Sequence, residues 1–192
     1  MDKKDIRKSI NDFYDEVAGE EVKVKGDIDK LNKSLGYSKE DLENIPEEAQ
    51  LGLGCGNPQE QGQPSPGEVV ADLGSGRGMD SFLASKAVGE SGRVIGIDNN
   101  YKMLEKAREI AHKKNFTNTE FRLGEIEYIP IADNQLDLLM SNCVINLSTD
   151  KSQVYREIYR SLKPGGRISI SDIVLKEELP EEIKADPNVH GT

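Results

Sequence analysis

The chain has 192 residues and a formal net charge of −10 at pH 7, a length that suits one compact domain carrying an extra arm. Hydrophobic residues make up 35% of it and gather in dense runs after residue 67, which excludes a chain that is disordered throughout. Acidic residues outnumber basic ones 35 to 25, so we expect no nucleic-acid partner. No apolar run approaches the ~20 residues of a membrane span, and the charged first residues are unlike a signal peptide. Two cysteines favour a reducing cytoplasm over a disulfide scaffold.

Residues 1–66 are predicted to form an N-terminal helical arm that ends in a loop. Apolar residues recur at helical spacing in segment 3–18, so this helix can lay one apolar stripe on the rest of the protein. The Ser38–Asp41 stretch resembles a capping box and begins a short helix that Pro46 ends. Segment 50–67 contains five glycines and three prolines. We therefore interpret it as a loop rather than a helix or a central strand.

From residue 67 onward, short apolar runs alternate with helical stretches. The predicted strands are 68–73, 93–98, 119–123, 136–141 and 167–174. The predicted helices between them are 79–89, 100–115 and 150–162. The runs are nearly continuous rather than alternating, as expected of parallel strands that are covered on both faces. The pattern predicts an α/β fold with a doubly wound parallel sheet. We expect the strand order 3-2-1-4-5, with the loop after the first strand at the switch point.

A glycine-rich loop, Asp72-Leu-Gly-Ser-Gly-Arg-Gly78, follows the first predicted strand. Its spacing is G-x-G-x-G and not the G-x-G-x-x-G that cradles a dinucleotide pyrophosphate. The carboxylate of Asp72 would oppose a pyrophosphate but suits a ligand with an ammonium or sulfonium charge. Asp98 ends the second strand, where an acid can accept hydrogen bonds from ribose hydroxyls. These features indicate a nucleoside-type cofactor, with a tight turn and a solvated aspartate as the alternatives.

The resemblance to a known family rests on longer motifs. ADLGSGRG, VIGID, KPGG at 163–166 and PIADNQLDLLMSN resemble class I S-adenosylmethionine-dependent methyltransferases, which have a Rossmann-like fold. In KPGG, Pro and Gly suit the central positions of a type II turn that feeds the fifth strand. Within that superfamily LGLGCGNP, RLGEIEYIPIADN and SNCVINLSTDK resemble the arsenite methyltransferases. The resemblance covers roughly residues 36–185, and it implies S-adenosylmethionine as the cofactor.

Carried over position by position, the resemblance implies a cofactor site at the carboxyl edge of the sheet. The glycine loop would lie against the methionine portion, Asp98 would take the ribose, and the backbone of Asn142 would lie near the methionyl ammonium. The implied cofactor residues are Asp72, Gly74, Ser75, Gly76, Asp98, Asn99, Met103, Glu125, Ile126 and Asn142. For Met103 the alternative is a place in the helix core, and for Glu125 it is a solvated turn.

The resemblance also implies that Cys55 and Cys143 are catalytic and act as ligands of trivalent arsenic. Soft thiolates select soft ions, which fits this chemistry. From the residues alone, Cys143 is equally compatible with a small core residue. Cys55 lies between two glycines that offer little core. A disulfide between the two is a further alternative, although it is unexpected in a cytoplasm.

The implied function is S-adenosylmethionine-dependent methylation of arsenite or thiol-bound As(III), supported by a thiol reductant and serving arsenic detoxification. The chain departs from the family because paired cysteines in the first fifty residues and a cysteine after the fifth strand are missing. The family's sheet continues with another helix and a hairpin, whereas only 18 residues follow Val174, so we expect a methyltransferase domain over 67–192 that lacks these last elements. The alternatives are a methyltransferase for a small organic oxygen, nitrogen or carbon nucleophile, and a fragment that binds cofactor or metalloid without turnover.

Overall fold

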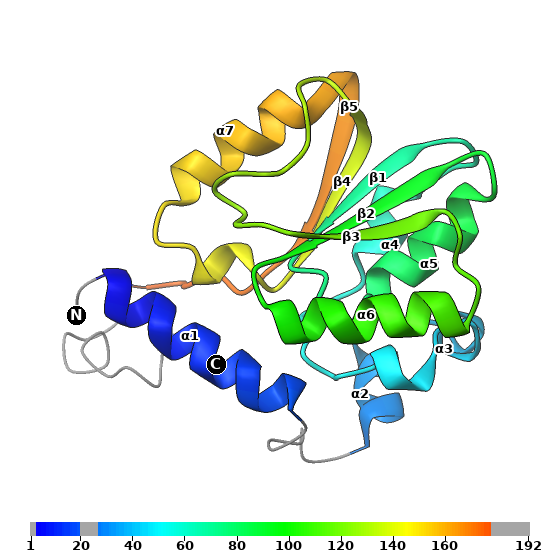
Figure 1. The fold of residues 1–192 in the computed structure, drawn as a ribbon, viewed down its shortest axis with the longest axis horizontal. Coiled ribbons are helices and arrows are strands. Elements are labelled where there is room, and N and C mark those ends of the chain that lie inside the picture. The colour runs from blue at the N-terminus through cyan, green and yellow to red at the C-terminus, as the bar shows by residue number, and fades with distance from the viewer. Residues whose placement is uncertain (1–2, 20–26, 178–192) are drawn as a thin grey trace.

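The computed structural model describes residues 3–19 and 27–177 (Figure 1). Its centre is a parallel sheet of five strands in the order β3-β2-β1-β4-β5, which confirms the predicted architecture. The strands are β1 Val69–Leu73, β2 Arg93–Asp98, β3 Thr119–Leu123, β4 Leu136–Asn142 and β5 Leu162–Ser171. The first four begin and end within one residue of the predicted bounds.

Helices cover both faces of the sheet (Figure 1). Helix α7 (Lys151–Ser161) covers one face, while α5 (Met79–Val88) and α6 (Tyr101–Lys113) cover the other. Alternate residues of one strand therefore enter different cores: Leu73 packs with Val154 of α7, and Val70 packs with Ala84 of α5. Because both faces are buried, the strands have continuous apolar sequences.

The N-terminal arm contains α1 (Lys3–Ala18), α2 (Ile28–Ser34), α3 (Lys39–Asn44) and the 3₁₀ turn η1 (Glu47–Ala49). The predicted capping box is present, because the Ser38 hydroxyl accepts from Asp41 N–H and the Asp41 carboxylate accepts from Ser38 N–H. Buried residues of this arm share one cluster with α5 and α6: Tyr37, Leu42, Ile45, Ala49, Phe82 and Leu104. The arm is thus packed against the sheet domain, and a domain boundary at residue 67 stays a prediction.

The prediction that segment 50–67 contains no helix was wrong, because α4 (Pro58–Gly62) lies within it. The Asn57 side chain caps this short helix by accepting from Gln59 N–H. Pro58 occupies the first turn, where its missing N–H has no cost. Helix α4 packs against β4 and β5. The glycines and prolines therefore mark the ends of a short helix, and the rest of the segment is irregular.

The fifth strand also differs from its predicted bounds of 167–174. Leu162 already pairs with Leu136, and the register then jumps so that Arg167 pairs with Leu138. Between these pairs the predicted turn bulges out, with Gly165 at a φ of 84° as the third residue of a type II turn requires. Pairing ends at Ser171, because β4 ends at Asn142, its last partner. The turn therefore interrupts β5 rather than preceding it.

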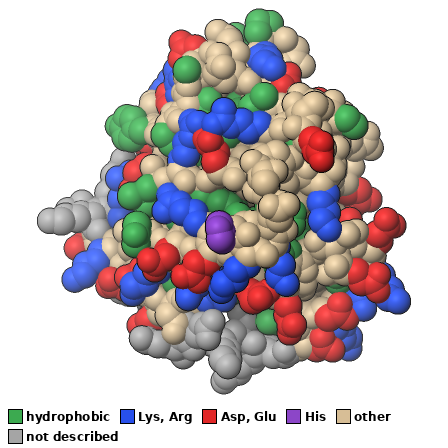
Figure 2. Space-filling view, turned by 45° about the vertical axis from the view of Figure 1, so that its right-hand side comes forward, with side chains coloured by type: hydrophobic (Ala, Val, Ile, Leu, Met, Phe, Trp, Pro, Cys, Tyr) green, Lys and Arg blue, Asp and Glu red, His purple; other side chains and the backbone are tan. Residues whose placement is uncertain are grey.

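On the face drawn in Figure 2, acidic and basic side chains are interspersed rather than segregated. Among the described residues, no helix combines the length and the apolar character that crossing a membrane requires.

Candidate functional site

A cavity opens at the carboxyl edge of the sheet, bounded by the glycine loop and the ends of β2 and β4. The residues predicted to contact the cofactor all line it: Asp72, Gly74, Ser75, Gly76, Asp98, Asn99, Met103, Glu125, Ile126 and Asn142. Cys143 lines the same cavity. The fold therefore brings the predicted positions into one place, as the order of a doubly wound sheet requires.

The glycine loop turns sharply between β1 and α5. Gly74 has a φ of 70°, and a Cβ placed there would lie 2.7 Å from the side chain of Val144. Only glycine therefore allows the loop to pass this close to the end of β4. Ser75 is buried in the cavity wall, and its hydroxyl has no hydrogen-bond partner in the structure. A buried hydroxyl of this kind is expected to meet a polar group of a ligand.

Asp98 connects the end of β2 to this loop. One carboxylate oxygen accepts from Gly76 N–H at 2.8 Å, and the other accepts from Asn100 N–H at 2.8 Å. Burial raises the pKa of Asp98, and these hydrogen bonds oppose that rise. A carboxylate has about four lone-pair sites, so Asp98 can accept further hydrogen bonds from a diol that enters the cavity.

Helix α1 covers the cavity, which its apolar stripe alone did not predict. Four of its residues line the cavity: Arg7, Ile10, Asn11 and Tyr14. Polar contacts fasten the helix on both sides of the cavity: among them, Arg7 lies 3.2 Å from Glu127, and Asn100 donates to Asp15 at 2.7 Å. Burial, followed by the charge of Asp98, raises the pKa of Tyr14, so its hydroxyl stays protonated at neutral pH.

Met103 serves the helix core and the cavity at once. It is 2% exposed and packs with Val17 and Ala18 at the end of α1, yet it also lines the cavity. Arg77 of the glycine loop donates to the carbonyl of Ala18 at 3.2 Å. The end of α1 is thus held against both the loop and α6.

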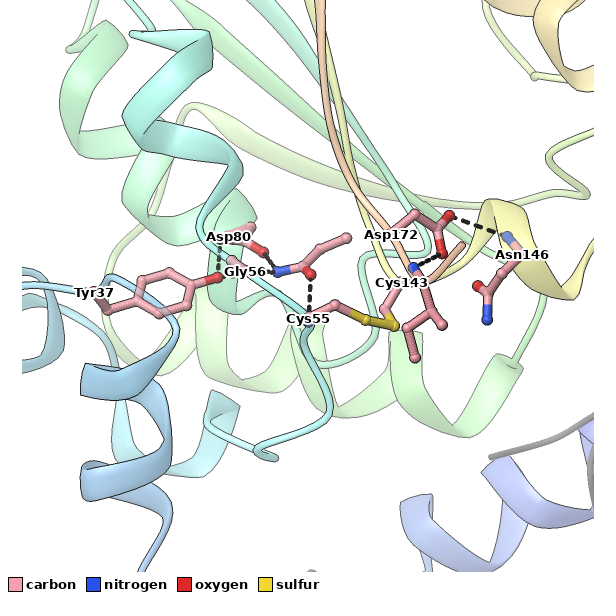
Figure 3. The surroundings of a disulfide bond; sticks show 9 residues. Tyr37, Cys55, Gly56, Asp80, Cys143, Asn146 and Asp172 are labelled. Atoms are coloured by element: carbon pink, nitrogen blue, oxygen red, sulfur yellow. Dashed lines mark hydrogen bonds between the residues drawn. A yellow bond between two sulfur atoms is a disulfide. The ribbon is translucent and has the colours of Figure 1, made fainter. Parts of the chain in front are cut away.

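Cys55 and Cys143 meet beside this cavity although they are 88 positions apart. The structure joins them in a disulfide, with a distance of 5.6 Å between their Cα atoms (Figure 3). Cys143 has a φ of 59°, and its N–H donates to the carbonyl of Ser171 at 2.8 Å. The irregular segment around Cys55 therefore folds back over the end of β4. Thiolate chemistry at this pair requires the reduced chain.

A buried polar network lies under the cavity, and sequence reasoning did not find Tyr37 or Asp80. The Tyr37 hydroxyl donates to Asp80 at 2.8 Å (Figure 3). The Ser81 hydroxyl donates to Asp72 at 2.7 Å. Burial raises the pKa of both carboxyls, and for Asp72 the neighbouring Asp80 raises it further. No sequence signal links these residues, because 43 positions separate Tyr37 from Asp80.

Asn142 belongs to this network through its side chain, whereas the family resemblance implies a role for its backbone. Its Nδ2 atom lies 3.0 Å from Asp80 Oδ2, and its Oδ1 atom accepts from Cys55 N–H at 2.9 Å.

Within residues 3–19 and 27–177, no group of three or more His, Cys, Asp or Glu side chains could hold a metal ion.

A family model described as a methyltransferase domain matches residues 64–191. The chain belongs to this family. The matched segment contains every strand of the sheet and every residue of the glycine loop. The cavity of this methyltransferase domain lies at the carboxyl ends of the strands, where open α/β sheets bind their ligands.

Curated relatives named arsenite methyltransferase are similar to this methyltransferase domain. The Halobacterium salinarum protein is 46% identical over 82% of this chain and 40% of its own length. The Mus musculus protein is 33% identical over 99% of this chain and 53% of its own length. The chain thus spans about half, or less, of the length of these relatives.

Solved structures that are similar to this chain are also described as methyltransferases. An arsenic (III) S-adenosylmethionine methyltransferase from Chlamydomonas reinhardtii matches 88% of this chain and 56% of its own, with a TM-score of 0.64 and 36% identity. A SAM-dependent methyltransferase from Aquifex aeolicus matches 82% of this chain and 80% of its own, with a TM-score of 0.58 and 26% identity.

Proposed function

We propose that this chain is the S-adenosylmethionine-binding part of an arsenite methyltransferase, with Cys55 and Cys143 as ligands of the arsenic substrate. The observation that carries the proposal is the position of the thiol pair. Cys143 lines the cavity in which all the predicted cofactor residues gather, and Cys55 is bonded to it. The relatives named arsenite methyltransferase support the same substrate.

The residues of the cavity fit S-adenosylmethionine. Asp98 offers free lone pairs for the ribose hydroxyls, and Asp72 is an acid near the place where a cationic methionine portion would lie. The unpartnered hydroxyl of Ser75 provides a further polar contact. When bound, the cofactor supplies an electrophilic methyl carbon on a sulfonium, which the lone pair of As(III) can attack without a general base.

The thiol pair must be reduced before it can bind arsenic. A small thiol reductant, such as a reducing cytoplasm contains, opens the disulfide by exchange: two reductant thiols are oxidised to one disulfide, and Cys55 and Cys143 each regain a thiol. Each of the two thiols then forms an As–S bond as one As–O bond of As(III) breaks, and the displaced oxygen ligand leaves with the thiol proton as water. Their position next to the cavity would hold the arsenic atom close to the bound cofactor, so the protein contributes mainly proximity and orientation.

Titration of the reduced chain with phenylarsine oxide tests the arsenic assignment, because this arsenical offers two exchangeable positions. We expect one equivalent to bind wild type, and no binding to Cys55→Ser, Cys143→Ser or oxidised wild type, since a hydroxyl is a poor ligand for a soft ion. Both variants should keep their affinity for S-adenosylmethionine, which controls for folding. If both variants bind the arsenical as wild type does, the arsenic assignment falls and methylation of a small organic nucleophile remains.

A turnover assay tests the reaction itself. The reduced chain is supplied with S-adenosylmethionine, arsenite and excess thiol, and mass spectrometry detects S-adenosylhomocysteine together with methylated arsenic. A chain that binds both ligands without forming either product would act as a binding module.

A further inference from the structure

The side chain of Asn142 clamps the backbone on both sides of the Cys55 α-carbon. Its Oδ1 atom accepts from Cys55 N–H at 2.9 Å, and its Nδ2 atom donates to the carbonyl of Gly56 at 2.9 Å. Asn142 directly precedes Cys143 in the sequence. One side chain thus ties the segment that carries the first cysteine to the strand end that carries the second.

The neighbouring glycines leave room for this clamp. A Cβ at Gly54 would lie 2.9 Å from Asn142 Nδ2, and a Cβ at Gly56 would lie 2.9 Å from the Ser171 hydroxyl. The Cys55 segment therefore lies between the ends of β4 and β5, with a glycine at each close approach. This packing explains the Gly-Cys-Gly pattern through contact with Asn142 and Ser171.

Two further groups orient the amide of Asn142. Asp80 Oδ2 lies 3.0 Å from Asn142 Nδ2, and Tyr37 donates to the other oxygen of Asp80 at 2.8 Å. Tyr37 is 3% exposed and Asp80 is 7% exposed. Because buried hydrogen bonds of this kind are costly to break, the network restricts the amide to the orientation that faces Cys55 (Figure 3).

We infer that Asn142, oriented by Asp80 and Tyr37, is a positioning residue that holds Cys55 beside Cys143 when the two thiols are reduced. Without the clamp, the Cys55 segment would sample open conformations, because its glycines restrict the backbone little. This inference deepens the function proposed above, since the paired thiols are the arsenic ligands of that proposal. The pairing itself can be measured without arsenic.

The test is the equilibrium between the chain and glutathione, in which two protein thiols and one glutathione disulfide give the Cys55–Cys143 disulfide and two glutathione thiols. Thiols are trapped by alkylation at defined ratios of reduced to oxidised glutathione and counted by mass spectrometry. The equilibrium constant reports how often the reduced thiols meet. For Asn142→Ala we expect it to fall by about tenfold or more, since two to three buried hydrogen bonds are lost.

Asn118 offers a matched control. Its side chain also bridges two backbone carbonyls, those of Ser85 and Gly89, at 2.9 and 2.8 Å, but it lies before β3, at the opposite edge of the sheet from the cysteines. Asn118→Ala should lose comparable stability and keep the wild-type glutathione equilibrium. Equal constants for Asn142→Ala and Asn118→Ala would overturn the inference.

Tyr37→Phe provides a second measurement that does not depend on how well Asn142→Ala folds. It removes one hydroxyl and should lower the equilibrium constant by about two- to tenfold; a wild-type constant in this variant, with its fold verified by circular dichroism, would count against the network. If these shifts appear while the wild-type chain binds no arsenical, the positioning role stands and the proposed function falls.

Discussion

The carboxylate of Asp98 accepts a hydrogen bond of 2.8 Å from the backbone N–H of Gly76. This bond joins the end of β2 to the glycine loop after β1, so the two sides of the predicted cofactor site form one unit. Changing Asp98 should therefore affect the ribose contact and the loop together.

We predict that Asp98→Ala weakens the binding of S-adenosylmethionine by about 1–3 kcal/mol, because two ribose hydroxyls lose a charged acceptor. Isothermal titration measures the change. Asp133→Ala is the control, since Asp133 is exposed and contacts Arg160 away from the cavity. NAD should not bind wild type, because the loop lacks the dinucleotide spacing. Unchanged affinity in Asp98→Ala would remove this residue from the site.

The contacts of α1 with the rest of the cavity wall predict that α1 slows the dissociation of the cofactor. Removing these contacts should therefore raise the dissociation rate. Arg7→Ala combined with Asp15→Ala removes the contacts to Glu127 and Asn100, each of which contributes on the order of 1 kcal/mol or less. We expect the dissociation rate of S-adenosylmethionine to rise about two- to tenfold in stopped-flow displacement. Lys8→Ala, an exposed change on the same helix, should leave it at the wild-type value, and a double variant with the wild-type rate would show that α1 does not retain the cofactor.

The buried carboxyl of Asp72 predicts a stability that falls as the pH rises. Burial, and then Asp80, raise the pKa of Asp72 in the folded chain. The folded state therefore holds a proton that the unfolded state releases above a pKa of about 3.9, and the free energy of unfolding decreases from that pH upward until the folded carboxyl also ionises. Asp72→Asn lacks this loss, so the free energy of unfolding of the variant relative to wild type should increase as the pH rises above about 4, which urea unfolding measures.

The matched control for this pH series is Glu68→Gln. Hydrogen bonds from Arg167 lower the pKa of Glu68, so its contribution is present above the ordinary glutamate pKa and is lost as the pH falls through the lowered one. The difference between Glu68→Gln and wild type should thus change only at the acid end. A pH-independent difference for Asp72→Asn would show that Asp72 does not titrate in this range.

The Cys55–Cys143 disulfide predicts a large dependence of stability on reductant. It closes a loop across 88 positions, and in the chain-entropy model such a loop raises the free energy of unfolding by about 4–5 kcal/mol. Guanidinium unfolding with and without reductant measures the difference in wild type. The free energy of unfolding of Cys143→Ser should be the same with and without reductant, because this variant cannot form the disulfide. An equal stability of the oxidised and reduced wild-type chain would mean that the bond forms at the expense of native contacts.

The sequence by itself determined the sheet. Continuous apolar runs separated by helical stretches favour parallel strands that are covered on both faces, and the crossover rule makes their connections right-handed. The glycine loop and Asp98 were equally predictable, because they follow strands whose carboxyl ends must share one edge. The capping box at Ser38 is local, so its signal is complete within a few residues.

Only the tertiary structure decided what surrounds that edge. The cover formed by α1, the position of Tyr37 against Asp80, and the clamp of Asn142 on Cys55 all join residues from 43 to 120 positions apart. Such contacts depend on how side chains pack after the chain has folded, and no periodicity or spacing records them. The short helix α4 and the bulge in β5 were missed for a related reason, because the packing partners of glycine- and proline-rich segments determine their conformation.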